Sequence, residues 1–211
     1  MTSVSCVLLA AGESRRMGNI NKLVLPVAGL PLLRRTALLL MKLPLRELVV
    51  VTGHEAQTTN ELLQGLPLQL VHNTHYRDGQ MSSVHAGLGA LKVSSDAVLV
   101  CLADLPLLEL GDLQRLMAAY CEGETSVVVP MHRGQRGNPI LLANQQRERI
   151  LAGNRNLGCK RLIQKNPEMV TVVEMDNDHT VFDLDTPEAY CELQARLAMA
   201  HVTQAYHCGR G

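Results

Sequence analysis

The chain has 211 residues, 46% of them hydrophobic, and its 20 lysines and arginines balance 20 aspartates and glutamates, so the formal net charge is zero. A neutral chain has no global field that attracts nucleic acid or an anionic membrane, and the lack of tryptophan disfavours base-stacking platforms. The length predicts one domain over residues 1–200, and the tail over 201–211, which lacks apolar periodicity, is expected to be frayed. Any anion must bind to a local cluster of charge.

The cysteines favour a reduced compartment. None of the six forms a CxxC pair or has zinc-ligand spacing with histidine, and Cys6 and Cys101 lie in apolar runs typical of buried thiols. The first apolar run leads into charged residues rather than a cleavage site, and no run of about 18 apolar residues could span a bilayer. We therefore expect a cytoplasmic protein without membrane association.

Short apolar runs alternate with helix-like segments along the chain. The expected strands are Val4–Leu9, Glu47–Thr52, Leu68–His72, Ala97–Leu102, Ser126–Pro130, Pro139–Leu142 and Met169–Val173. The expected helices are Leu32–Lys42, Glu55–Leu63, Ser82–Lys92, Asp112–Cys121, Gln145–Leu151, Leu157–Gln164 and Pro187 to about Ala200, the last capped by Thr186. Almost continuously apolar strands between helices predict an α/β fold with a mainly parallel sheet covered on both faces. Ligands of such folds bind at the carboxyl ends of the strands.

The segment LAAGESRRMGNINK, from Leu9 to Lys22, follows the first expected strand and has the layout of a nucleotide site. Small residues let backbone N–H groups approach a polyphosphate, and Arg15, Arg16 and Lys22 supply positive charge. The segment matches neither GxxxxGK[ST] nor GxGxxG. It therefore predicts a basic phosphate-binding loop of another kind.

Carboxylates follow two later segments. Asp104 ends the apolar run Ala97–Leu102, where its oxygens would suit Mg²⁺, although a loop or capping role is the alternative. Asp183 and Asp185 share one face if their segment is extended, because strand side chains alternate. Asp185 also stands next to Thr186 at a helix start, so capping competes with metal binding there. With Asp104, one of these two residues would complete a two-carboxylate metal site.

Two further stretches carry polar groups. In NTHYRDGQMSSVHAG, turn residues lead into a helix opened by Ser82 and Ser83, and such a helix start attracts anions or a polar base. An ordinary capped helix explains the same residues. In HRGQRGNPI, Arg133 and Arg136 lie in an expected hairpin, which either closes over a substrate anion or is a plain solvated turn.

Together these stretches resemble the nucleotidyltransferases of molybdenum cofactor maturation, from Val4 to about Glu192. The opening loop is similar to the pattern LAAGxSxRMGxxK, carried here by Leu9, Ala10, Ala11, Gly12, Ser14, Arg16, Met17, Gly18 and Lys22. The NTHYRDGQMSS, LADLP, GNP and DLDTP stretches fall in the order of that family. The resemblance implies a Rossmann-like α/β fold of the nucleotide-diphospho-sugar transferase type, with helices on both faces of a mainly parallel sheet.

The resemblance also implies a substrate. Leu-Ala-Ala-Gly is similar to the cytidylyltransferases of the family, whereas its guanylyltransferases carry Leu-Ala-Gly-Gly, and the methyl group of Ala11 would narrow the base pocket toward a pyrimidine. The implied reaction moves CMP from CTP to molybdenum-molybdopterin and releases pyrophosphate, and the recipient molybdenum hydroxylase is a further candidate partner. The alternatives are a guanylyltransferase, a sugar- or alditol-phosphate nucleotidyltransferase of the same fold, or a non-catalytic carrier of the cofactor.

The same resemblance implies roles for individual residues. Arg16, Lys22 and Asp104 would be catalytic, and Asp104 and Asp185 would bind Mg²⁺ or Mn²⁺. The implied nucleotide-binding residues are Leu9, Ala10, Ala11, Gly12, Ser14, Arg16, Lys22, Asn73, Ser82, Ser83 and Asp104, among which Asn73, Ser82 and Ser83 would read the cytosine or the ribose. Arg133, Arg136 and Asn138 would contact the phosphate of the pterin acceptor.

Overall fold

The structure, a computed structural model, describes residues 2–18, 20–121, 126–153 and 167–208. The seven expected strands are present as β1 (Val4–Ala10), β4 (Leu45–Thr52), β5 (Gln69–His72), β6 (Ala97–Leu102), β7 (Val127–His132), β9 (Ile140–Ala143) and β10 (Val170–Glu174). The helices are α1 (Leu32–Leu40), α2 (Ala56–Leu62), α3 (Gln80–Ala90), α4 (Leu110–Cys121), α5 (Asn144–Leu151) and α7 (Pro187–Cys208). The helix expected over Leu157–Gln164 lies outside the described residues.

Short elements join these segments, and the sequence patterns did not indicate them. They are η1 (Arg15–Met17), η2 (Lys22–Val24), β2 (Pro26–Val27), β3 (Leu30–Pro31), η3 (Tyr76–Asp78), β8 (Gln135–Arg136) and η4 (Pro167–Met169). Each has only two or three residues, too few for a periodic pattern to emerge.

Eight of the described strands form one large sheet in the order β10-β7-β9-β6-β1-β4-β5, with β8 paired to β7, and β2 and β3 form a separate antiparallel pair. The pairs β6–β1, β1–β4, β4–β5 and β10–β7 are parallel, which confirms the mainly parallel sheet. β9 runs antiparallel to both β6 and β7. Only seven residues separate β7 from β9, fewer than the dozen or so that a parallel crossover needs, so the chain returns as a hairpin.

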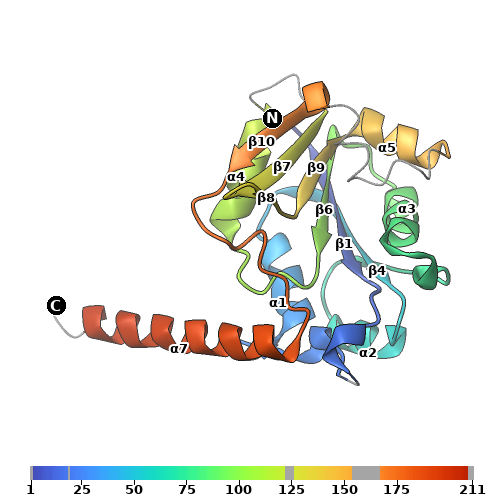
Figure 1. Ribbon diagram of the computed structural model, residues 1–211. Coiled ribbons are helices and arrows are strands. Elements are labelled where there is room, and N and C mark those ends of the chain that lie inside the picture. The colour runs from blue at the N-terminus through green and yellow to red at the C-terminus, as the bar shows by residue number, and fades with distance from the viewer. Residues whose placement is uncertain (1, 19, 122–125, 154–166, 209–211) are drawn as a thin grey trace.

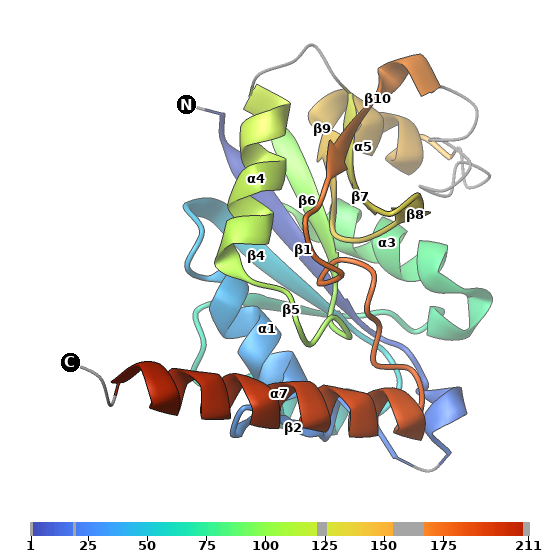
Figure 2. The same ribbon diagram turned by 60° about the vertical axis from the view of Figure 1, so that its left-hand side comes forward.

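Helices cover both faces of the sheet, with α1, α2 and α4 on one side and α3 and α5 on the other (Figures 1 and 2). On β1, Leu8 packs in the cluster that contains Leu33 of α1 and Leu116 of α4. Its neighbour Val7 packs in the opposite cluster, with Leu88 of α3. Because successive strand residues point to opposite faces and both faces are buried, the central strands are mainly apolar.

The last helix, α7, lies apart from these two layers and extends beyond the body of the protein (Figures 1 and 2). Its N-cap is Thr186, as expected, whose hydroxyl accepts a hydrogen bond from the backbone N–H of Ala189 over 3.2 Å. Leu193 packs against Leu32 in a separate small cluster. The helix continues to Cys208, past its expected end near Ala200, and fraying of the remaining tail stays a prediction.

Two other expectations can be compared with the structure. Cys6 and Cys101 are fully buried, and burial raises the pKa of both thiols. Among the helices of the described ranges, none is both long enough and apolar enough to cross a membrane.

The carboxyl ends of β5, β4, β1 and β6 meet at one edge of the sheet. The backbone N–H of Ala103 donates to the carbonyl of Leu9 over 3.1 Å, and that of Asn73 donates to Thr52 over 2.8 Å. The loop after β1, Asp104 after β6 and the turn after β5 are therefore neighbours, although up to about a hundred residues separate them along the chain.

Candidate active site

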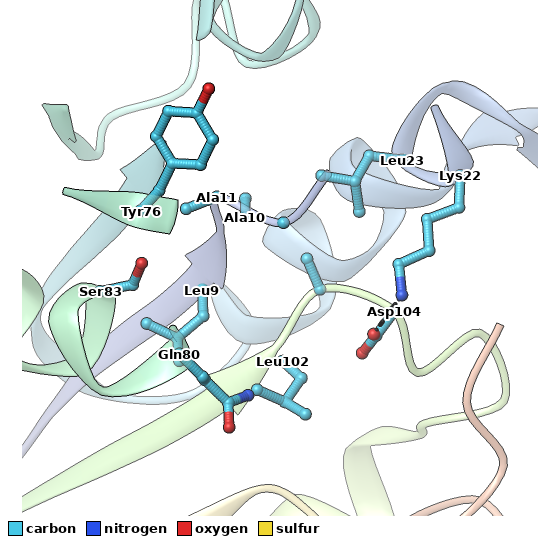
Figure 3. A pocket seen from close by; sticks show the side chains of 12 residues that line it. Leu9, Ala10, Ala11, Lys22, Leu23, Tyr76, Gln80, Ser83, Leu102 and Asp104 are labelled. Atoms are coloured by element: carbon cyan, nitrogen blue, oxygen red, sulfur yellow. Dashed lines mark hydrogen bonds and ion pairs between the residues drawn. The ribbon is translucent and has the colours of Figure 1, made fainter. Parts of the chain in front are cut away.

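A cavity of about 190 Å³ opens at this edge of the sheet (Figure 3). The loop after β1, the loop after β6 and the η3–α3 segment form its walls. The lining residues are Leu9, Ala10, Ala11, Gly12, Lys22, Leu23, Tyr76, Gln80, Ser83, Leu102, Ala103 and Asp104. Of the residues proposed from the sequence, the cavity therefore brings together the LAAG segment, Lys22, Ser83 and Asp104.

The loop after β1 is shaped by its own hydrogen bonds. Ser14 has a left-handed backbone with φ of 52°, and its carbonyl accepts from the N–H of Met17 over 2.8 Å. Its hydroxyl oxygen accepts from the N–H of Lys22 over 3.3 Å. Ser14 therefore holds the two ends of the loop together and does not line the cavity, and its contact with a nucleotide stays a prediction. Arg15 points elsewhere and pairs with Glu13 over 2.6 Å.

Lys22 lies between two carboxylates at the mouth of the cavity. Its Nζ is 2.6 Å from Asp104 Oδ2 and 2.6 Å from Asp185 Oδ1, and Figure 3 shows it directed at Asp104. Burial lowers the pKa of Lys22, but the two adjacent carboxylates outweigh burial and hold the pKa above its ordinary value. The basic loop and the two acidic residues therefore converge at one point.

Arg16 completes this charge cluster from outside. Its Nη2 is 2.5 Å from Asp185 Oδ2, and the Arg16 side chain is 70% exposed, against 12% for Lys22. An exposed ion pair contributes little to stability, so this guanidinium is free to change partners.

The segment that carries Asp185 is fastened to the loop after β6. The backbone N–H of Leu184 donates to the carbonyl of Asp104 over 2.9 Å. Of the two aspartates left open by the sequence, Asp185 makes the contact with Lys22. Asp183 is exposed to solvent as a whole residue, but its carboxyl group is partly desolvated. This desolvation, followed by the negative charges of Asp104 and Asp185, raises the pKa of Asp183 to about 6.

The donor set of Asp104 and Asp185 fits a divalent cation. Asp104 Oδ1 is buried and has no hydrogen-bond partner among the described residues, an arrangement that is unfavourable unless another group satisfies the oxygen. Within the described ranges, no group of three or more His, Cys, Asp or Glu side chains is placed to hold a metal. Two carboxylates instead suit Mg²⁺ or Mn²⁺ that also binds phosphate oxygens, since Mg²⁺ commonly takes one or two protein carboxylates.

Tyr76 and Gln80 form part of the opposite wall of the cavity (Figure 3) and were missed by the sequence analysis. Gly53 allows this wall to form, because a Cβ at position 53 would lie 2.7 Å from Tyr76 Cβ and 2.8 Å from Ala11 Cβ. Only the isolated aromatic ring in a polar turn could have indicated Tyr76. Nothing in the sequence distinguishes Gln80 from any exposed polar residue at a helix start.

The three polar residues proposed to read the base have different positions. Asn73 is 5% exposed and donates from Nδ2 to Ser82 Oγ over 2.9 Å and to Ser83 Oγ over 3.0 Å. Ser83 lines the cavity, whereas Asn73 and Ser82 line a neighbouring cavity of about 440 Å³. Asn73 thus orients Ser83 from behind, and direct base contacts by Asn73 and Ser82 stay predictions.

The basic hairpin expected to bind the acceptor is present as β7, β8 and the turn between them. Arg133 occupies that turn with φ of 49°. The N–H of Asn138 donates to the carbonyl of Thr180 over 2.8 Å, and a Cβ on Gly137 would collide with the same carbonyl. The hairpin is thereby docked on the segment that leads to the acidic residues. In the part of the chain that the structure describes, no hydrogen bond or ion pair joins Arg133 or Arg136 to the cavity, so their acceptor role stays a prediction.

A small-residue loop, a largely buried lysine and two carboxylates at the carboxyl edge of such a sheet are suited to bind a nucleoside triphosphate together with a divalent ion. The pattern of the MobA-like NTP transferase domain matches residues 6–170, and the chain belongs to that family. The structure has the fold of the nucleotide-diphospho-sugar transferases.

Two relatives and one solved structure show the range of similar proteins. The chain is 27% identical over 191 residues to nicotine blue oxidoreductase of Paenarthrobacter nicotinovorans, covering 88% of this chain and 93% of that protein. It is 23% identical over 197 residues to molybdenum cofactor cytidylyltransferase of Escherichia coli (strain K12), covering 93% of this chain and 98% of that protein. Rv0371c of Mycobacterium tuberculosis H37Rv, solved in complex with manganese, superposes with a TM-score of 0.75 at 19% identity, over 91% of this chain and 98% of that one.

Proposed function

We propose that this protein transfers CMP from CTP to molybdenum-molybdopterin, forming the cytosine dinucleotide of the cofactor and releasing pyrophosphate. The observation that carries the proposal is the position of Lys22 between Asp104 and Asp185, at the mouth of a cavity lined by a loop of small residues. Membership of the MobA-like NTP transferase family supports nucleotidyl transfer, and the Escherichia coli relative supports the choice of CTP and molybdopterin.

The basic residues account for the handling of the triphosphate. The terminal phosphate of the acceptor would attack the α-phosphorus of CTP in line, forming one P–O bond while the bond to the β-phosphate breaks. Backbone N–H groups from Ala11 to Ser14 would cradle the β- and γ-phosphates, while Arg16 and Lys22 neutralise the charge that develops on the departing pyrophosphate. A phosphate monoester is already a nucleophile near neutral pH, so the proposal requires no Ser-His-Asp triad.

Asp104 and Asp185 would hold the divalent ion. When bound, Mg²⁺ or Mn²⁺ would neutralise phosphate charge and align the two reacting groups. The manganese complex of the structural neighbour Rv0371c is consistent with such a metal. The protein itself contributes hard carboxylate oxygens on two segments joined by the hydrogen bond from Leu184 to Asp104.

The far wall of the cavity would select the base. Ala11, Tyr76, Gln80 and Ser83 surround the space opposite Lys22 (Figure 3). The Gln80 amide and the Ser83 hydroxyl offer both donors and acceptors to a base edge. The Ala11 methyl group takes up room that a purine would need.

The test is pyrophosphate release from each of the four nucleoside triphosphates, with Mg²⁺ or Mn²⁺, in the presence and absence of molybdenum-molybdopterin. We expect release from CTP that depends on both the acceptor and the metal. Release from GTP in preference to CTP would make the protein a guanylyltransferase, and release only with a sugar or alditol phosphate would change the acceptor. Binding of the cofactor without release from any triphosphate would indicate a carrier, and NAD(P)H oxidation in its place would favour an oxidoreductase.

A further inference from the structure

The ammonium group of Lys22 contacts the same two carboxylates that fit the divalent metal. It lies 2.6 Å from an oxygen of Asp104 and 2.6 Å from an oxygen of Asp185, bridging segments 81 residues apart. Side-chain exposures of 12% for Lys22, 18% for Asp104 and 25% for Asp185 place this bridge largely within the protein. Lys22 is therefore the group that joins the two carboxylates in a partly enclosed space, as a metal ion would, while the exposed Arg16 pairs with Asp185 alone.

A divalent ion on these carboxylates could not leave Lys22 where it is. Metal–oxygen distances of about 2.0–2.1 Å for Mg²⁺ would place the ion within a few ångströms of Nζ, and the two positive charges would repel. The lysine has a flexible four-carbon stem and lies on the loop after β1, so its ammonium can turn toward a phosphate in the adjoining cavity. Arg16, with its exposed pairing to Asp185, can turn the same way.

We propose that Lys22 is an ionic latch that competes with the metal for Asp104 and Asp185, so that metal and triphosphate enter by exchanging partners. This inference rests on the proposed nucleotidyltransferase function. A metal ion alone must displace Lys22 from its two partners. A triphosphate alone must draw Lys22 away, which leaves Asp104 without its ion-pair partner and Asp185 with Arg16 alone, beside the negative charge of the triphosphate. When both bind, the ammonium passes to the phosphates and the metal to the carboxylates, and every charge keeps a partner.

The latch makes a prediction that a simple phosphate-binding lysine does not. If Lys22 only holds phosphates, its loss leaves the binding of metal alone unchanged. If it competes with the metal, its loss strengthens the binding of metal alone while it weakens the binding of nucleotide. The test therefore measures Mn²⁺ affinity without nucleotide, by electron paramagnetic resonance and by isothermal titration calorimetry.

The key variants are Lys22→Met, which keeps the length of the side chain without its charge, and Lys22→Arg, which keeps the charge. We expect Lys22→Met to bind Mn²⁺ about tenfold more tightly than the unaltered protein, within the range of measured coupling between sites, and Lys22→Arg to show no such gain. Arg15→Met is the matched control, because Arg15 lies in the same loop but pairs with Glu13, away from the metal carboxylates. The double variant that combines Lys22→Met with Asp104→Asn should lose this gain in Mn²⁺ affinity, which would show that the ion binds at Asp104.

Circular dichroism checks that each variant is folded, and Lys22→Gln provides a second uncharged variant if Lys22→Met does not fold. An equal Mn²⁺ affinity in the unaltered protein and in the folded uncharged variant would overturn the latch, even if pyrophosphate release from CTP is demonstrated. A gain that survives loss of the Asp104 charge would overturn it as well. A gain that depends on Asp104 supports the latch even if CTP proves to be the wrong nucleotide, since this measurement uses the metal alone.

Discussion

Alanine at position 53 would place a methyl group 2.7 Å from Tyr76 Cβ, 2.8 Å from Tyr76 Cγ and 2.8 Å from Ala11 Cβ. Carbon atoms in contact prefer about 3.5–4.0 Å, so three contacts are too close by roughly 0.7–1.3 Å. Ala11 is 5% exposed and its carbonyl accepts a hydrogen bond from the N–H of His54, so it cannot retreat freely. The strain must move Tyr76, Ala11 or the end of β4.

Overpacking of this kind typically costs about 1–3 kcal/mol, and we expect Gly53→Ala to lower the free energy of unfolding by that amount. Because Ala11 and Tyr76 both line the cavity, the same change should weaken CTP binding about tenfold or more, since displacements near 1 Å are costly in positioned sites. Denaturation in urea and calorimetric titration with CTP measure the two effects. Gly111→Ala is the control, because nothing lies within 4 Å of a Cβ there and its backbone is helical. If Gly53→Ala matches the unaltered protein in both measurements, the close approach at the cavity wall is refuted.

Three other substitutions test separate parts of the structure. Asp104→Ala should lower metal-dependent turnover by at least about a hundredfold while circular dichroism shows an intact fold, and turnover that survives would remove Asp104 from its role. Ala11→Gly should reduce the preference for CTP over GTP in competition binding. An unchanged preference would show that the methyl group of Ala11 does not select the base. The hydrogen bond from His179 to Asp112, over 3.0 Å, raises the pKa of His179 above its ordinary value of 6.5. Protonated His179 therefore contributes its full stabilisation of the folded state below pH 6.5, and this contribution is lost as the pH rises through the raised pKa. His179→Gln should therefore be less stable than the unaltered protein by about 1 kcal/mol near pH 6, by urea denaturation, and the gap should narrow by pH 9. A constant gap would contradict this assignment.

Much of the fold could be predicted because strands and helices of this length leave a periodic pattern. The apolar runs around Val7 and Leu99 predicted buried parallel strands, and Thr186 marked the start of the last helix correctly. The antiparallel direction of β9 was not predicted, because an apolar run carries no sign of its direction. The short connection from His132 to Ile140 decides it, through the minimum length of a crossover.

Some residues of the candidate site could likewise be predicted from the sequence, and others could not. The loop of small and basic residues and the position of Asp104 after a strand were recognisable, since each occupies a contiguous stretch. Asp183 and Asp185 could not be ranked from the sequence, because the choice depends on which carboxyl reaches Lys22 from a segment 163 residues away. Tyr76 and Gln80 enter the cavity wall only through the approach of the η3–α3 segment to the loop after β1, which Gly53 permits.

Residue order alone determined which chemical groups are available and which strands, helices and loops carry them. This was possible because the alternation of apolar and polar residues and the composition of loops are local properties of a chain. Which groups touch was decided by the folded arrangement, in which neighbouring parallel strands align their carboxyl ends and set a lysine from the first loop against two acids from distant ones. Contacts of this kind depend on strand order and on side-chain reach across the sheet edge, and neither is encoded within any single stretch of the sequence.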